Sequence, residues 1–144
     1  MKLKDVMTRG VETIRPQSTL KEAAYKMKSL NVGAMPVCDE DNRLIGLLTD
    51  RDVTVRATAE GRDPNSTKAS DIMTRDLICG FEEQDIREAA SIMEQKQIRR
   101  IPVLDRNQQI IGIVSLGDLA VKARDEKLAG EVIQRVSEPA RPQR

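Results

Sequence analysis

The sequence predicts a mixed α/β (α+β) protein made of two β-α-β-β-α units in tandem, followed by a C-terminal helix. The first observation is an internal repeat: residues 6–9 (Val-Met-Thr-Arg) recur as residues 72–75 (Ile-Met-Thr-Arg), 66 residues later. Between residues 5 and 57, 16 of 53 positions are identical to their counterparts without a gap. The second observation is a helical spacing of apolar residues. The third is a pair of short apolar runs on either side of a polar turn, and both patterns occur once in each repeat.

The first repeat contains the signals of two helices and a hairpin. Thr19 and Glu22 have the spacing of a capping box. Apolar residues follow at i, i+3, i+4, i+7 and i+10, on one helical face, and Asn31 and Gly33 suit the end of that helix. The expected elements are a strand at residues 11–14, a helix at 20–30, strands at 35–38 and 44–48, and a helix from 49 to about 59.

The second repeat carries the same signals in the same order. Asp85 and Glu88 open its first helix, and beyond the repeat Leu128, Val132 and Val136 lie at i, i+4 and i+8 of a further helix. The expected elements are a helix that begins at 85–88, strands at 101–104 and 110–114, and a helix from 115 to about 124. The predicted organisation is repeat 1 (1–60), a polar linker (61–68), repeat 2 (69–124), and a C-terminal helix with a frayed tail (125–144).

The composition argues against several classes of partner. The net charge is +1 and the pI is near 7.7, so no strong field attracts nucleic acid or an anionic membrane. The only aromatic residues are Tyr25 and Phe81, too few for base stacking. No apolar run approaches the length of a membrane span, and no apolar signal segment follows the N-terminus. We therefore expect a cytoplasmic protein without nucleic-acid or membrane partners.

The chemistry-bearing residues do not form a catalytic pattern. The sequence has no histidine, which removes the commonest general base and the commonest zinc ligand. Cys38 and Cys79 do not form a CxxC pair, and we expect two buried free thiols. No GxxxxGK[ST] phosphate loop is present. The sequence predicts no enzyme, no catalytic residue, no metal site and no catalytic cofactor.

Taken together, the repeated motifs resemble the cystathionine-beta-synthase (CBS) domain family. The resemblance covers about residues 5 to 124. It rests on Met-Thr near the start of each repeat, a Pro-Val strand, an aliphatic-Gly-aliphatic strand and Thr/Ser-x-x-Asp, in that order and twice. It implies a Bateman module, in which two repeats pack through their sheets about a pseudo-two-fold axis and form two clefts. It also implies an adenosyl ligand (AMP, ADP, ATP, NAD or S-adenosylmethionine) and a homodimer.

The resemblance places ligand binding on three parts of each repeat. The first part is the Thr/Ser-x-x-Asp motif, whose hydroxyl and carboxylate suit a ribose diol, although the same spacing also suits a helix cap. The second part is the segment that leads into the Pro-Val strand, and the third is the first strand. The expected ligand-binding residues of repeat 1 are Thr13, Ile14, Gly33, Ala34, Met35, Pro36, Thr49, Arg51 and Asp52. Those of repeat 2 are Cys79, Arg99, Arg100, Ile101, Pro102, Ser115 and Asp118.

The basic residues of these motifs differ between the repeats. Repeat 1 has Arg51 within its Thr-x-x-Asp motif, where repeat 2 has Gly117, while repeat 2 alone has Arg99 and Arg100 before its proline. We expect inequivalent clefts with a phosphate reached by arginines from both repeats, the alternative being solvated surface arginines. Gly80 replaces an aliphatic wall residue, which we expect to weaken or reshape the second cleft.

Three functions follow from these expectations, in decreasing order. The first is a regulatory adenine-nucleotide sensor that acts in trans on an unknown effector protein. The second is a dimerisation or protein-interaction module without a small ligand. The third, an enzyme, is disfavoured by the missing catalytic motifs. The mid-strand glycines, Gly46 and Gly112, are expected to serve packing against a neighbouring segment.

Overall fold

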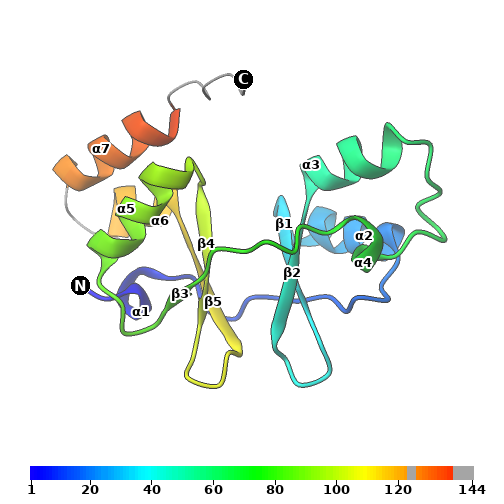
Figure 1. Ribbon diagram of the computed structural model, residues 1–144, viewed down its shortest axis with the longest axis horizontal. Coiled ribbons are helices and arrows are strands. Elements are labelled where there is room, and N and C mark those ends of the chain that lie inside the picture. Colours follow the sequence, from blue (N-terminus) through cyan, green and yellow to red (C-terminus); the bar gives the residue numbers. More distant parts are fainter. Residues whose placement is uncertain (123–125, 138–144) are drawn as a thin grey trace. The chain divides into compact units, whose positions relative to one another are not determined.

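The computed structural model describes residues 1–122 and 126–137 (Figure 1). These residues form two compact units, which we call unit 1 (Met1–Val11 with Ile78–Arg144) and unit 2 (Glu12–Leu77). The units do not coincide with the sequence repeats. The opening segment of each repeat belongs to the unit that contains the hairpin of the other repeat.

Unit 2 has the helices and hairpin expected for the first repeat. Thr19 caps the first long helix, since its Oγ1 accepts a hydrogen bond from the Glu22 N–H at 3.2 Å. The helix ends at Asn31, whose φ of 55° is left-handed, so both expected ends are confirmed. The elements are α2 (Leu20–Leu30), β1 (Ala34–Cys38), β2 (Leu44–Thr49), α3 (Asp50–Asp52), the π-helix η1 (Val53–Thr58) and α4 (Ala69–Ile72).

The sheet of unit 2 is smaller than expected. Strands β1 and β2 pair antiparallel, as the hairpin pattern predicted. The predicted strand at 11–14 is wrong, because only Ile14 pairs with β1, in an isolated parallel bridge to Val37. The chain leaves the sheet immediately afterwards, since the Arg15 N–H donates to Ser18 Oγ instead, at 3.2 Å. On the other edge, Thr74 forms an isolated bridge with Leu47 of β2.

Unit 1 repeats this plan with a three-stranded sheet in the order β3-β4-β5. Strand β3 is parallel to β4, and β4 pairs antiparallel with β5. Thr8 bridges to Ile113 of β5, the counterpart of the Thr74 bridge in unit 2. The elements are α1 (Leu3–Val6), β3 (Gly80–Phe81), α5 (Ile86–Lys96), β4 (Arg100–Leu104), β5 (Ile110–Ser115), α6 (Leu116–Lys122) and α7 (Glu126–Ser137).

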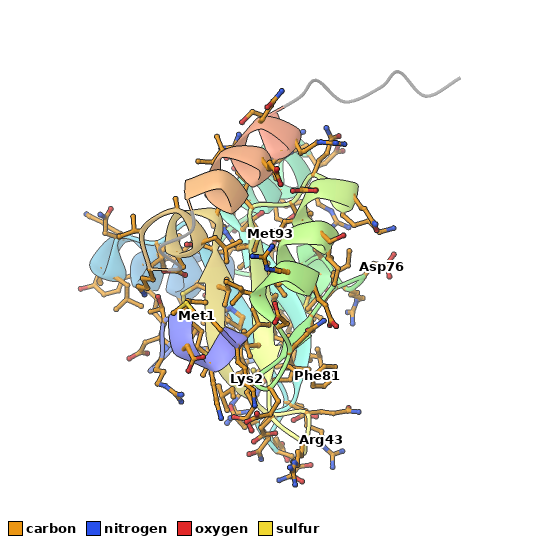
Figure 2. The ribbon with its side chains drawn as sticks, turned by 90° about the vertical axis from the view of Figure 1, so that its left-hand side faces the viewer. Met1, Lys2, Arg43, Asp76, Phe81 and Met93 are labelled. Carbon is orange, nitrogen blue, oxygen red and sulfur yellow. The ribbon has the colours of Figure 1, made fainter. Side chains whose placement is uncertain are left out.

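Backbone hydrogen bonds explain why each opening segment joins the unit that it does. In unit 1 the Leu3 N–H donates to the Gln84 carbonyl at 2.9 Å. In unit 2 the equivalent Ala69 N–H donates to the Ser18 carbonyl at 2.8 Å. Figure 2 shows Lys2, next to Leu3, on the same side of unit 1 as Phe81 of β3. The one-turn helices α1 and α4 were not predicted, because a single turn has too few residues for a periodic pattern.

Each unit has its own apolar core. The core of unit 2 gathers Ile14, Leu20, Ala23, Met27, Met35, Val37, Leu48, Ala57, Ala69, Ile72 and Met73. The core of unit 1 gathers Leu3, Val6, Met7, Ile86, Ala89, Ala90, Met93, Ile101, Val103, Val114, Leu119 and Val136.

The end of the chain partly tests the predicted C-terminal helix. Helix α7 is present, lies beside α5 and α6 in Figure 1, and buries Val136 in the core of unit 1. The side chains of Leu128 and Val132, the turn at 123–125 and the tail at 138–144 lie outside the described residues. Within the described part of the chain, no helix is long and apolar enough to cross a bilayer.

Candidate functional site

The Thr/Ser-x-x-Asp motif lies at the turn from a strand into a helix in both units. In unit 2 the Thr49 N–H donates to Asp52 Oδ2 at 3.0 Å, and the Asp52 N–H donates to Thr49 Oγ1 at 3.1 Å. In unit 1 the Ser115 N–H donates to Asp118 Oδ2 at 2.8 Å, and the Asp118 N–H donates to Ser115 Oγ at 3.0 Å. The motif therefore works as a reciprocal helix cap in both copies.

The two carboxylates are largely buried and have additional partners. Asp52 and Asp118 are only 8% and 9% exposed. In unit 2 the Thr74 hydroxyl donates to both Asp52 oxygens at 3.3 Å, and Arg56 Nη1 lies 3.9 Å from Oδ1. In unit 1 the Lys122 Nζ lies 3.0 Å from Asp118 Oδ1. These partners fix each carboxylate in one orientation. Each carboxylate oxygen has two lone pairs, so it can still accept a further hydrogen bond.

Three of these partners were missed by sequence reasoning. Arg56 and Lys122 stand at i+4 from their aspartates, a spacing at which helix side chains meet. That signal was present in the sequence. Thr74 belongs to the repeated Met-Thr motif, but its contact with Asp52 spans 22 residues and depends on the tertiary fold.

The segment before each Pro-Val strand lies directly beside the motif. In unit 2 Ala34 pairs across the ladder with Thr49, and the Gly33 carbonyl accepts from the Asp50 N–H at 2.9 Å. In unit 1 Arg100 pairs with Ser115, and the Arg99 carbonyl accepts from the Leu116 N–H at 2.8 Å. The fold therefore brings together, in each unit, two of the three predicted parts. The next residues in these strands, Met35, Pro36, Ile101 and Pro102, are buried.

The third predicted part lies one strand further away. The Ile14 N–H donates to the Pro36 carbonyl at 2.9 Å, on the edge of β1 opposite to β2, so Thr13 and Ile14 are separated from Thr49 by the width of β1. Cys79 and Gly80 have the same relation to β5, since Gly80 pairs with Val103 of β4. Adjacent strands are about 4.8 Å apart, so the separation perpendicular to the strands is roughly 10 Å.

Gly80 does not leave a gap in unit 1. A Cβ built on Gly80 would lie 2.5 Å from Leu3 Cδ1, so the Leu3 side chain occupies the volume that a larger residue would fill. The counterparts in unit 2 are Ile14 and Ala69, a large and a small residue in the same core. The loss of an aliphatic side chain in the first strand is thus compensated by a larger residue in the N-terminal segment.

The mid-strand glycines serve packing, as expected. A Cβ on Gly46 would lie 2.5 Å from Met73 Sδ, and one on Gly112 would lie 2.6 Å from Met7 Sδ. The methionine of each Met-Thr motif therefore lies against the bare backbone of the aliphatic-Gly-aliphatic strand. This packing explains why these two motifs recur together.

The cysteines carry no sign of activation. Cys38 is buried and Cys79 is half-buried, and both are free. Burial raises the pKa of both thiols, so both are protonated at neutral pH. Among the described residues, no group of three or more Cys, Asp or Glu side chains is close enough to hold a metal ion.

The basic residues of the motifs lie at the surface. Arg51 is exposed and lines a surface pocket of about 340 Å³ with Asp50, Thr54 and Val55. In unit 1 Arg99 is exposed and Arg100 is half-buried. Neither of these two guanidinium groups has a hydrogen-bond or ion-pair partner within residues 1–122 and 126–137.

A protein-family model and two bacterial relatives match most of this chain. The family model for the CBS domain matches residues 3–57 and 69–125. The CBS domain-containing protein YhcV of Bacillus subtilis is 44% identical over 135 residues, which is 94% of this chain and 94% of YhcV. Hypoxic response protein 1 of Mycobacterium tuberculosis is 36% identical over 117 residues, 81% of each chain.

Two solved structures are similar to most of this chain. Hypoxic Response Protein I, solved with two coordinated zinc ions, has a TM-score of 0.76 at 35% identity and covers 83% of this chain and 97% of that one. The CBS domain pair of protein MJ0100, in complex with 5′-methylthioadenosine and S-adenosyl-L-methionine, has a TM-score of 0.74 at 28% identity. That match covers 83% of this chain and 93% of the MJ0100 chain.

Proposed function

The chain belongs to the CBS domain family, and we propose that it is a regulatory module that binds an adenosine-containing ligand. The observation that carries the proposal is the repeated, pre-oriented hydroxyl–carboxylate pair, Thr49 with Asp52 and Ser115 with Asp118. A ribose diol offers two hydroxyl donors, and a carboxylate can accept from both. The pair of MJ0100, a solved neighbour, holds two adenosine derivatives, which supports the same ligand class for this chain.

The geometry favours binding because the site is preorganised. Each aspartate is held by backbone and side-chain partners before any ligand arrives, so little rotamer entropy remains to be lost. In the cap, one oxygen of each carboxylate accepts a hydrogen bond from a backbone N–H. The remaining lone pairs of the carboxylate can accept hydrogen bonds from a sugar. The proposal assigns no catalytic step to this chain.

Thermal unfolding against a ligand panel tests the proposal. The panel is AMP, ADP, ATP, NAD, 5′-methylthioadenosine and S-adenosylmethionine, with GTP as the base control. A ligand present at about 100 times its Kd stabilises the folded state by roughly 2.7 kcal/mol, which for a chain of this size raises Tm by about 5–10 °C. We expect such a shift with at least one adenosine ligand and none with GTP.

Variants assign the shift to a site. Asp52→Asn and Asp118→Asn keep the side-chain volume but replace the carboxylate, which would accept hydrogen bonds from both hydroxyls of the diol, by a neutral amide. Asp76→Asn is the matched control, because Asp76 is an exposed aspartate that belongs to neither motif. Loss of the shift in one motif variant but not in the control identifies the site. If every ligand leaves Tm unchanged at millimolar concentration, the proposed ligand class is wrong.

A second function, as an interaction module, is favoured by two exposed valines. Val55 and Val121 occupy the same position of the two repeats and are 44% and 78% exposed. We propose that this pair of apolar side chains contacts a second copy of the chain. Sedimentation of the wild type and of Val55→Glu and Val121→Glu tests this, with Val32→Glu as a control of similar exposure. A dimer that persists in both variants would contradict it.

A regulatory role further needs a partner that reads the bound state. We propose that this effector is a separate protein, contacted in trans. Amide hydrogen exchange with and without ligand would locate the responsive surface, and protection confined to the binding motifs would argue against a transmitted change.

A further inference from the structure

The two candidate sites have the same backbone but different charges. Seven positions in each unit comprise the hydroxyl–carboxylate pair and five neighbouring residues. In unit 2 they contain two acids and two bases, and in unit 1 they contain one acid and three bases. The unit 2 set is Gly33, Ala34, Thr49, Asp50, Arg51, Asp52 and Arg56, and the unit 1 set is Arg99, Arg100, Ser115, Leu116, Gly117, Asp118 and Lys122.

Arg100 is the residue best placed to change the ligand of unit 1. It pairs with Ser115 across the β4–β5 ladder. Directly opposed residues in an antiparallel pair project from the same face, with Cβ atoms about 5 Å apart. The Arg100 side chain therefore starts beside the Ser115 hydroxyl. In unit 2 the corresponding neighbour of Thr49 is Ala34, which brings no charge.

The position next to each of these residues also differs in charge between the two units. In unit 2 the Asp50 carboxylate lies over Gly33, since a Cβ on Gly33 would be 3.0 Å from Asp50 Oδ2. In unit 1 Leu116 stands in place of the acid and Arg99 in place of the glycine. An anion that approaches unit 2 at this point meets a carboxylate, whereas the corresponding positions of unit 1 carry an arginine and no acid.

We propose that the Ser115–Asp118 site of unit 1 takes a phosphate-bearing adenosine, and that the Thr49–Asp52 site of unit 2 takes an adenosine without phosphate. The inference rests on the proposed function and adds the ligand class of each site. The guanidinium groups of Arg99 and Arg100 have no hydrogen-bond or ion-pair partner among the described residues, so binding a phosphate breaks no existing ion pair. A guanidinium group matches a phosphate with two parallel hydrogen bonds. Phosphate recognition then lies within unit 1, without the contribution from Arg51 that the sequence suggested.

Isothermal titration of the full chain with AMP and with 5′-methylthioadenosine tests the assignment. Arg99→Ala and Arg100→Ala should each weaken AMP binding by about tenfold, the effect of one lost charge-assisted hydrogen bond. Binding of 5′-methylthioadenosine should change less than about twofold. Arg106→Ala is the matched control, because Arg106 is an exposed arginine in the turn after β4. Raising the salt concentration should weaken the binding of AMP but not that of 5′-methylthioadenosine.

A variant that gains an AMP site is a stronger test than one that loses affinity. Ala34→Arg with Asp50→Leu gives unit 2 the residues that unit 1 has at two of these positions. The AMP stoichiometry should then rise from one to two sites per chain. The inference is overturned if the arginine variants bind AMP like the wild type, or if they weaken both ligands equally. If the wild type binds AMP at two equal sites, the assignment also fails although the proposed function stands. Failure of both ligands to bind the wild type would instead refute the proposed function itself.

Discussion

Units 1 and 2 fill the same backbone position with opposite choices of residue size. In unit 2 the large Ile14, which bridges to β1, packs in one core with the small Ala69 of the one-turn helix α4, whereas in unit 1 Gly80 is small and Leu3 is large. The difference teaches that the opening segment of each repeat is part of the core of the unit that it joins. A core position is specified by the total volume of its neighbours, and either segment can provide it.

The largest expected effect comes from breaking this complementarity in unit 1. Leu3→Ala removes a fully buried side chain and leaves a cavity beside Gly80, which should cost about 2–5 kcal/mol of unfolding free energy. Gly80→Ile alone should also destabilise, because its Cβ would lie 2.5 Å from Leu3 Cδ1. Urea unfolding measures both changes.

The double variant sharpens the comparison. Leu3→Ala with Gly80→Ile copies the arrangement of Ala69 and Ile14, so the two costs should not add, and a coupling of about 1–3 kcal/mol is expected. Leu3→Ala with Ile92→Val is a control pair, since Ile92 packs against the same core without contributing to the Gly80 contact. Strict additivity in the first pair would show that volume is not exchanged between the segments.

A smaller effect distinguishes the two mid-strand glycines. Gly112→Ala should cost about 2–3 kcal/mol, because the new Cβ would meet the Thr8 carbonyl at 2.9 Å as well as the Met7 side chain. For Gly46→Ala the three atoms nearest to the new Cβ all belong to the Met73 side chain, which can change rotamer, so the cost should be about 1 kcal/mol or less. Chemical denaturation compares them, and an equal loss would indicate that the backbone contact is not the deciding one.

The Met-Thr motifs differ by one hydrogen bond. The Thr74 hydroxyl donates to the buried Asp52, while the equivalent Thr8 is exposed and makes no side-chain bond to Asp118 among the described residues. Thr74→Val should therefore lower the unfolding free energy by about 1 kcal/mol, and Thr8→Val should leave it nearly unchanged. If the two variants unfold alike, the Thr74 bond does not stabilise unit 2.

The smallest expected effect is electrostatic and belongs to unit 1 alone. Glu83 accepts from Lys2 Nζ at 2.5 Å and from Lys4 Nζ at 2.7 Å, and these hydrogen bonds lower the pKa of Glu83 from 4.5 to about 2. The repeat counterpart in unit 2 is Gln17, which has no charge.

The sign of the pH dependence follows from that direction. A carboxylate with a lowered folded pKa stabilises fully above pH 4.5, and the contribution disappears as the pH falls toward 2. Glu83→Gln should therefore remove a small, salt-sensitive part of the acid-dependent change in Tm, because the pair is solvent-exposed. Glu40→Gln, an exposed acid of unit 2, is the control, and an identical Tm profile in both variants would contradict the role of the pair.

Much of the candidate site was predictable from the sequence because its geometry is local. The cap between Ser115 and Asp118 spans three residues, and the cross-strand position of Arg100 follows from the hairpin register that a polar turn between two apolar runs implies. The contact of Thr74 with Asp52 was not predictable, since nothing in either short segment requires the other.

The sequence by itself determined the two repeats, the capped helices Leu20–Leu30 and Ile86–Lys96, and the two hairpins, because capping, helical spacing and turn chemistry act over a few residues. Only the tertiary structure decided which unit each opening segment joins. The repeat is symmetric, so Leu3 and Ala69 are equally plausible neighbours for either first strand until side-chain volumes are compared. The choice depends on packing and backbone hydrogen bonds between residues far apart in the chain, and a pattern read along the sequence does not contain those distances.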